Sequence, residues 1–392
     1  MTADSARLTA NWPFPTTVRF GPGRLGELGK TAARLGIKRP LIVTDAGLAA
    51  SGIVAAAGTS LADAGLGAEV FSQVKSNPTA ANVAAGASTY RDGGHDGIVA
   101  IGGGSAMDAA KAIALQAGHN GPVLDYAVGG PRYRDINGAA IAPLIAVPTT
   151  SGTGSEMGYA AVISDEEART KRILYHVNLL ARTVICDPEL VTGLPANLTA
   201  WTGMDAAVHC IEAYCATTYN PLCDGIAAEG LRLIATWLPR AVADGGDLEA
   251  RSQMMAAAAM GAVAFNKGLG AVHAISHAIG AHKDSHHGLT NAVVLPYVLD
   301  HNRAAIDDRC AVLARCMGLP RADFTGLMDW TLAIRETFQI PHTLDGLGVG
   351  ADDLDALAAT AAADVTAREN PVPVDTAALR GIMARALSGT LG

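Results

Sequence analysis

The 392-residue chain lacks an excess of basic residues, a long hydrophobic run and closely spaced cysteines. Its 29 Lys and Arg against 37 Asp and Glu leave a net charge of -8, so we expect neither nucleic acid nor an anionic membrane as a partner, because both are bound through a basic face. The longest apolar run, residues 254–265, is too short to span a bilayer. The first residues lack the basic-then-apolar order of a signal peptide, and the six cysteines show no CxxC spacing. We therefore expect a cytoplasmic protein with free thiols.

The distribution of apolar residues divides the chain into two parts. Hydrophobic residues make up 49% and charged residues 17%, which excludes disorder as the overall state. Short apolar runs bounded by Asp, Gly or Pro alternate with Ala-rich helical stretches in the first half, a pattern typical of a parallel sheet covered on both faces. These runs are 41–44, 97–101, 144–147 and 183–186.

After residue 192 the strand signals stop and the pattern is helical, with breaks expected at 266–268, Pro296, Pro320, Pro341 and Pro371. The sequence therefore predicts a Rossmann-like α/β domain over residues 1–192 and an all-helical domain over residues 193–392.

Glycine is abundant, with 44 residues, and the first glycine-rich motif is Gly21–Gly26. It matches the GxGxxG pattern of dinucleotide-binding loops and follows a strand-like run at 17–20. However, Pro22 removes a backbone N–H where a pyrophosphate would need one, and Arg19 does not suit a fully buried central strand. We therefore interpret this motif as a turn that leads into a helix.

A second glycine-rich motif, Gly102–Ser105, follows the apolar run 97–101 directly and precedes a helix predicted over 106–115. Three glycines bring bare N–H groups close to an anion at the positive end of a helix, as pyrophosphate binding requires. The alternative is a capping box formed by Ser105 and Asp108, which would not explain three successive glycines.

Two further features indicate a ligand site at the carboxyl ends of these strands. The loop 148–155 is rich in hydroxyls and glycine and follows the run 144–147. Asp45 ends the run 41–44, where it either accepts hydrogen bonds from a ribose or caps a helix. A carboxylate there would repel a 2′-phosphate and so favours NAD over NADP.

Acidic and histidine side chains gather on two predicted helices of the second part. Asp205 and His209, with Glu212 nearby, lie beside an apolar stripe at a spacing of i and i+4. For this pair alone, a mutual hydrogen bond would be sufficient explanation. Five of the 11 histidines, however, fall within residues 273–287, the first two again at i and i+4. One Asp and several His without Cys predict a site for Fe²⁺ or Zn²⁺.

Four motifs together resemble the iron-containing (group III) alcohol dehydrogenase family, over nearly the whole chain from about Thr17. They are GGGSAMD at 102–108, PTTSGTGSE at 148–156, GMDAAVHCIEAY at 203–214 and VHAISHAIGAHKDSHHG at 272–288. The resemblance implies the architecture shared with dehydroquinate synthase, and a metal- and NAD(P)-dependent interconversion of a small alcohol with its aldehyde or ketone. It also implies Fe²⁺, with Zn²⁺ as the alternative, and a homodimer or larger homo-oligomer.

The same resemblance implies roles for individual residues. The metal ligands would be Asp205, His209, His273 and His287, and His277 would be catalytic without binding the metal. The nucleotide would contact Asp45, Asn77, Gly103, Gly104, Ser105, Asp108, Thr149, Thr150, Thr153 and Lys171. The substrate pocket would include Ala160, Leu269 and Thr366.

The chain departs from the family pattern at Met157–Ala160 and at Ala278, which leaves the identity of the substrate open. Two alternative functions remain at this point. One is a zinc polyol dehydrogenase of the glycerol type with the same fold, and the other is a metal- and nucleotide-binding sensor without turnover. A dehydroquinate synthase-like lyase is more remote.

Overall fold

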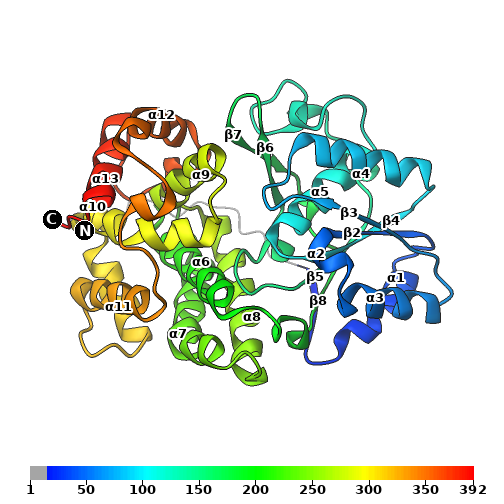
Figure 1. Cartoon of the computed structure of the whole chain (residues 1–392), viewed down its shortest axis with the longest axis horizontal. Coiled ribbons are helices and arrows are strands. Elements are labelled where there is room, and N and C mark those ends of the chain that lie inside the picture. The colour runs from blue at the N-terminus through cyan, green and yellow to red at the C-terminus, as the bar shows by residue number, and fades with distance from the viewer. Residues whose placement is uncertain (1–15) are drawn as a thin grey trace. The chain divides into compact units, whose positions relative to one another are not determined.

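The computed structural model describes residues 16–392, which form two compact units (Figure 1). The first unit contains residues 16–150 and 154–193, and the second contains residues 151–153 and 194–392. The chain thus passes from one unit to the other after Gly193, and a short segment of the loop at 148–155 groups with the second unit.

The first unit is built on a six-stranded parallel sheet with the order β1-β8-β5-β4-β2-β3. Its strands are β1 Thr17–Phe20, β2 Pro40–Asp45, β3 Glu69–Val74, β4 Gly97–Gly102, β5 Leu144–Pro148 and β8 Thr183–Cys186. The four strands predicted as continuous apolar runs, β2, β4, β5 and β8, are almost fully buried. Strand β1 lies at an edge, which lets Arg19 reach Glu27.

Helices cover both faces of this sheet (Figure 1). They are α1 Leu28–Arg34, α2 Ala46–Ala49, α3 Gly52–Asp63, α4 Ala80–Asp92 and α5 Gly104–Ala117. Helices α1 and α3 pack together on one face, and α4 and α5 pack together on the other. Since the chain leaves β2 toward β3 and leaves β4 toward β5, the loops after β2 and β4 diverge to opposite faces. Open α/β sheets bind ligands at such a change of direction in the strand order.

Three strands were not predicted from the sequence. Strand β3 has a mostly exposed, polar pattern and no apolar run. Strands β6 Ala160–Asp165 and β7 Thr170–Tyr175 form a separate antiparallel hairpin whose residues are only partly buried. Strands β3 and β7 lack an apolar run of four residues, which is the signal of a buried strand. Strand β6 begins with the apolar run 160–163, which we did not predict as a strand.

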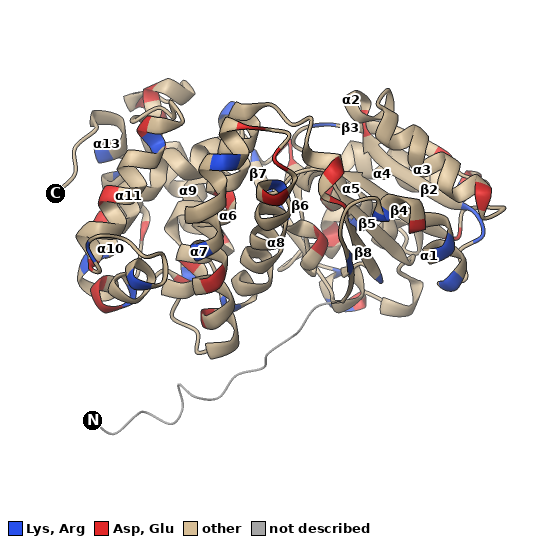
Figure 2. Ribbon diagram, turned by 90° about the horizontal axis from the view of Figure 1, so that it is seen from below, with Lys and Arg blue, Asp and Glu red and all other residues tan. Residues whose placement is uncertain are grey.

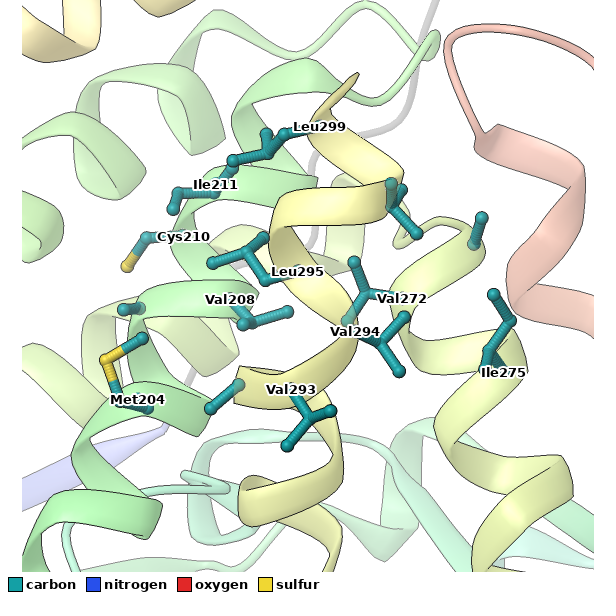
Figure 3. Packing of buried hydrophobic residues seen from close by; sticks show 14 of the residues in the cluster. Met204, Val208, Cys210, Ile211, Val272, Ile275, Val293, Val294, Leu295 and Leu299 are labelled. Carbon is teal, nitrogen blue, oxygen red and sulfur yellow. The ribbon is translucent and has the colours of Figure 1, made fainter. Parts of the chain in front are cut away.

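The second unit is helical, as predicted. Its helices are α6 Ala196–Cys215, α7 Pro221–Ala243, α8 Leu248–Ala264, α9 Ala271–Lys283, α10 His287–Cys316, α11 Phe324–Thr337, α12 Leu354–Ala363 and α13 Thr376–Ser388. Helix α10 packs on α6 and on α9. Figure 3 shows Leu295 of α10 near Val208 of α6, and Val294 near Val272 of α9. Helices α6 and α9, which carry three of the predicted metal ligands, are therefore both anchored on α10, which carries the fourth.

The break expected at Pro296 was wrong, because α10 continues through this residue from His287 to Cys316. A proline inside a helix costs about 3 kcal/mol, mainly because it lacks the N–H that would complete the hydrogen-bond ladder. The flanking residues Leu295 and Tyr297 are buried in the core of the unit. Their burial on a continuous helix offsets that cost.

The turn at Gly21–Gly26 is architectural, as predicted. The N–H of Gly23 donates to Asp187 Oδ1 at 3.1 Å, and the N–H of Leu25 donates to Asp187 Oδ2 at 2.9 Å. The N–H of Gly21 donates to the carbonyl of Cys186. The turn therefore binds an anion that the chain itself supplies, the carboxylate of Asp187.

Lys and Arg are interspersed with Asp and Glu along the helices in the view of Figure 2. No single helix in the range 16–392 meets the length and hydropathy needed to cross a bilayer. The bent pair 248–267 and 271–283, which meet at 105°, meets that test only when taken together.

Candidate functional site

Four side chains of the helical unit converge on one point. Asp205, His209, His273 and His287 each offer a ligand atom, and these atoms lie within 4.8 Å of one another. Helix α6 supplies the first two from successive turns, α9 supplies His273 from its first turn, and α10 begins at His287. The first three are buried and His287 is partly buried. The structure thus brings together the four residues that the sequence predicted as ligands.

Close packing of α10 against α6 allows this convergence. A Cβ atom on Gly288 would lie 2.4 Å from the carbonyl oxygen of Trp201 and 3.0 Å from Cβ of Asp205. Only glycine permits the two backbones to approach so closely at this position. The neighbouring His287 is thereby brought to within 3.5 Å of Asp205, measured from Nε2 to Oδ1.

The imidazole rings are held through their outer nitrogens. His273 Nδ1 lies 2.6 Å from Glu212 Oε2, and His287 Nδ1 lies 3.1 Å from the hydroxyl of Ser276. The Nε2 atoms of both rings face Nδ2 of Asn291, at 3.4 and 3.1 Å. Each ring therefore directs Nε2 into the cluster.

The chemistry of this donor set fits a divalent cation. Burial lowers the pKa of His209 and lowers that of His273 well below its usual value, so both rings are neutral and keep a lone pair for a metal. Asp205 accepts a hydrogen bond from Asn291 at 2.7 Å, but within residues 16–392 it forms no ion pair with Lys or Arg. A buried carboxylate is stable only when a cation or several donors compensate it, and a bound metal would do so.

His277 lies beside this cluster without belonging to it. Its ring stacks on that of His287, with centroids 5.4 Å apart, and its Nδ1 lies 2.9 Å from Asp364 Oδ2. Asp364 in turn accepts hydrogen bonds from the N–H and the hydroxyl of Thr366. Sequence reasoning missed Asp364, because it is 87 residues from His277 and belongs to no motif.

The predicted substrate residues have the following positions. The hydroxyl of Thr366 donates to Asp364, and the same carboxylate contacts His277, so Asp364 links the two residues. Leu269 is partly buried in the segment just before α9. Ala160 begins β6 in the first unit, and its carbonyl accepts a hydrogen bond from Lys111 at 2.7 Å.

The glycine-rich loop of the first unit forms the junction between β4 and α5. Gly102 has a φ of +151°, and a Cβ atom there would lie 2.5 Å from Cβ of Ala106, so a side chain is excluded. The N–H of Thr149 donates to the carbonyl of Gly102 at 2.9 Å, which places the loop after β5 next to the loop after β4. Helix α5 starts at Gly104, and its first N–H groups have no partner within the helix. This backbone arrangement fits a pyrophosphate.

Three polar residues predicted to contact the nucleotide also hold the protein together. Asp45 Oδ1 caps α2 by accepting the N–H of Leu48 at 2.9 Å, which is the capping role considered from the sequence. Lys171 Nζ donates to Asn77 Oδ1 at 2.5 Å. The contact of Asp45 is local, whereas that of Lys171 connects two distant segments of the first unit. Nucleotide contact by each of these residues stays a prediction.

The capping box considered for Ser105 and Asp108 was wrong. Gly103 is the N-cap of α5, and the hydroxyl of Ser105 donates to the carbonyl of Ser76. Asp108 instead accepts the hydroxyl of Ser155 at 2.6 Å and the N–H of Val162 at 3.0 Å. Its carboxylate therefore ties α5 to the segment that follows β5 and to the hairpin.

A buried lysine lies beside Asp108. Lys111 donates to the carbonyl and the hydroxyl of Ser155, at 2.5 and 2.9 Å. Burial lowers the pKa of Lys111 to about 8 and raises the pKa of neighbouring Glu156 to about 7. Sequence reasoning missed this lysine because its spacing from Asp108 resembles that of an ordinary surface pair on a helix.

Comparisons with known proteins place the chain in a family. Residues 15–188 match the iron-containing alcohol dehydrogenase family, and residues 199–387 match the C-terminal region of Fe-containing alcohol dehydrogenases. The chain is 42% identical to 4-hydroxybutyrate dehydrogenase of Cupriavidus necator over 95% of this chain and 99% of that protein. It is 36% identical to NAD-dependent methanol dehydrogenase of Bacillus methanolicus, covering 92% and 95%. The structure of alcohol dehydrogenase from Oenococcus oeni matches with a TM-score of 0.89 at 33% identity, covering 96% of this chain and 100% of that one.

The chain belongs to the iron-containing alcohol dehydrogenase family, and it is an alcohol-type oxidoreductase of that family. The family, the fold class and the type of enzyme predicted from the sequence are thus confirmed. Membership of the family implies a metal and NAD(H) as cofactors.

Proposed function

We propose that this enzyme interconverts a small primary alcohol and its aldehyde with NAD⁺ and NADH, and that Asp205, His209, His273 and His287 hold Fe²⁺. The observation that carries the proposal is the convergence of one carboxylate and three imidazoles within 4.8 Å, in a buried site that fits a divalent cation. Such a metal, when bound, acts as a Lewis acid that lowers the pKa of an alcohol and polarises a carbonyl.

The protein residues around this site orient the metal ligands and transfer the proton of the substrate hydroxyl. Asn291 holds Asp205, while Glu212 and Ser276 hold the rings of His273 and His287, so these hydrogen bonds orient the groups that would bind the metal. His277 is oriented by Asp364 through Nδ1, which leaves Nε2 to accept the proton of the substrate hydroxyl or to return it.

The first unit supplies the nucleotide site in this proposal. The start of α5 at Gly103 and Gly104 holds the pyrophosphate, and Asp45 accepts hydrogen bonds from the adenosine ribose. Asp45 lies at the end of β2, next to β4 in the sheet, and its carboxylate would repel a 2′-phosphate. This arrangement favours NAD over NADP. Hydride transfer is the chemistry that the nicotinamide supplies when bound.

The proposal extends to the organisation of the protein. We assign nucleotide binding to residues 1–192 and metal binding to residues 193–392. Membership of the family supports a homodimer or larger homo-oligomer that works in the cytoplasm. The similarity to 4-hydroxybutyrate dehydrogenase, at 42% identity, supports a short ω-hydroxy acid among the substrates to be tested first.

One assay tests the proposal. The purified enzyme is depleted of metal with a chelator, reloaded with Fe²⁺ or Zn²⁺, and assayed for NAD⁺ reduction with 4-hydroxybutyrate, methanol, 1,3-propanediol, 1-butanol and glycerol. We expect turnover of a primary alcohol that disappears with the chelator and returns with Fe²⁺. Equal turnover in the metal-free enzyme would contradict the assignment of the metal site. A preference for glycerol with Zn²⁺ would instead identify a polyol dehydrogenase.

A further inference from the structure

Glu212 lies beside the proposed metal site without belonging to it. It is on α6, three residues after His209, and only 7% of its surface is exposed. One carboxylate oxygen, Oε1, accepts the N–H of Val272 at 2.7 Å. The other, Oε2, lies 2.6 Å from Nδ1 of His273. The same side chain therefore touches both the backbone and the ring of the first turn of α9.

The contact with the ring determines which nitrogen of His273 carries the proton. The amide nitrogen of Asn291 is a donor and faces Nε2 of His273, so Nε2 is the acceptor and Nδ1 carries the proton that Glu212 Oε2 accepts. A neutral imidazole protonated on Nδ1 keeps its lone pair on Nε2. That nitrogen faces Asn291 and the other ligands, at 3.4 Å from Asn291 Nδ2. Glu212 therefore selects the form of His273 that can bind a metal through Nε2.

The contact with the backbone holds the N-terminus of α9, the helix that carries the ring of His273. The N-cap of α9 is Gly270, which has no side chain to cap the helix. Glu212 accepts the N–H of Val272 in its place, and Asn370 Oδ1 accepts the N–H of Ala271 at 3.1 Å. A negative charge is also favourable at the N-terminus of a helix. Glu212 and Asn370 thus share the capping of α9, but only Glu212 touches a ligand ring.

We propose that Glu212 is a positioning residue for the metal, because it fixes the proton of His273 on Nδ1 and directs Nε2 into the cluster. This inference rests on the proposed function, since it takes His273 as a metal ligand. Partners of this kind, which contact a ligand and not the metal, typically change metal affinity 10–100-fold when they are replaced.

The substitution Glu212→Gln tests this role with little change in volume. Gln can still cap Val272 through its amide oxygen, but its amide nitrogen then donates toward His273 Nδ1 and favours the proton on Nε2. Metal affinity is measured by titrating Zn²⁺ against a competing chelator. We expect the affinity of Glu212→Gln for Zn²⁺ to fall about 10–100-fold. Unchanged affinity would overturn the proposal.

The matched control is Asn370→Ala, which removes the other acceptor at the start of α9 and touches no ligand ring. We expect it to lower the melting temperature while changing Zn²⁺ affinity less than threefold, or about 0.65 kcal/mol. An equal loss of affinity in both variants would show that Glu212 acts only by seating the helix, and would overturn the proposal.

A measurement on the unsubstituted enzyme keeps the test independent of the folding of either variant. Nitrogen NMR of ¹⁵N-histidine in the Zn²⁺-loaded enzyme, assigned with His273→Gln, should show a protonated Nδ1 and a metal-bound Nε2 on His273. Binding through Nδ1 would overturn the proposal.

The variant His287→Ala separates the two levels of inference. If it binds Zn²⁺ as the unsubstituted enzyme does, the proposed metal site itself is wrong. If it loses Zn²⁺ while Glu212→Gln retains it, only the role of Glu212 is wrong.

Discussion

The two units form their candidate sites from different groups, namely side chains in the helical unit and backbone in the sheet unit. In the helical unit, side chains make the site, and other side chains hold them, as Glu212 holds His273 and Asp364 holds His277. In the sheet unit, the backbone makes the site, and the predicted polar residues contact one another, as Lys171 contacts Asn77. Substitution of a side chain should therefore remove function from the first site outright, whereas the second should respond mainly to changes of the backbone.

The largest effect is expected for His287→Ala. It removes one of four ligands from the cluster, and we expect it to abolish both metal retention and turnover. Metal content after gel filtration and the rate of NADH formation are the measurements. Near-normal activity in a metal-free variant would exclude the metal site and, with it, the contrast between the two units.

His277→Ala should keep the metal and lose rate, because His277 lies outside the ligand cluster. Loss of a general acid or base typically lowers the rate about 10²–10⁴-fold. The comparison of kcat with metal content separates this outcome from the previous one. If His277→Ala loses metal as completely as His287→Ala, the roles of the two histidines have been interchanged.

For the sheet unit, Gly102→Ala should weaken NAD⁺ binding without affecting the metal. The new methyl group would meet Ala106 at 2.5 Å, at a φ of +151° that other residues rarely adopt. Backbone strain of this kind costs about 1–3 kcal/mol, which corresponds to an increase in the Kd of NADH of roughly 5- to 150-fold. Fluorescence titration of NADH measures it.

The control for this change is Gly26→Ala, in the turn that Asp187 fills. A Cβ atom on Gly26 would meet nothing within 4 Å, so NADH binding should not change. A comparable loss in both variants would return the Gly21–Gly26 turn to consideration as a nucleotide site.

The sequence revealed residues that are close along the chain and missed those that only the fold brings together. Metal ligands one helical turn apart leave a spacing that can be read directly, so Asp205 and His209 were recognised as a pair. The residues that orient the histidines of the site leave no such spacing: Asp364 comes 87 residues after His277, which is not a ligand, and only the fold brings the two together. Buried apolar runs marked β2, β4, β5 and β8, whereas the hairpin β6–β7 was missed because each of its strands combines apolar with polar residues and is mostly only partly buried.

The smallest effect is expected at Asp45, where the two roles considered for this side chain, contact with the ribose and capping of α2, can be tested separately. Serine is also a good N-cap, so Asp45→Ser keeps the hydrogen bond to the N–H of Leu48 while it removes the negative charge. If the carboxylate repels a 2′-phosphate, its removal should improve kcat/KM for NADP⁺ relative to NAD⁺. A charge interaction of about 1 kcal/mol, the value for two unit charges about 4 Å apart in bulk water, corresponds to roughly a fivefold change in this ratio. An unchanged ratio with unchanged stability would show that Asp45 serves only as a cap. A polar side chain at this edge of the sheet would then contribute to the fold alone, and cofactor choice would depend on the backbone and on other residues at that edge.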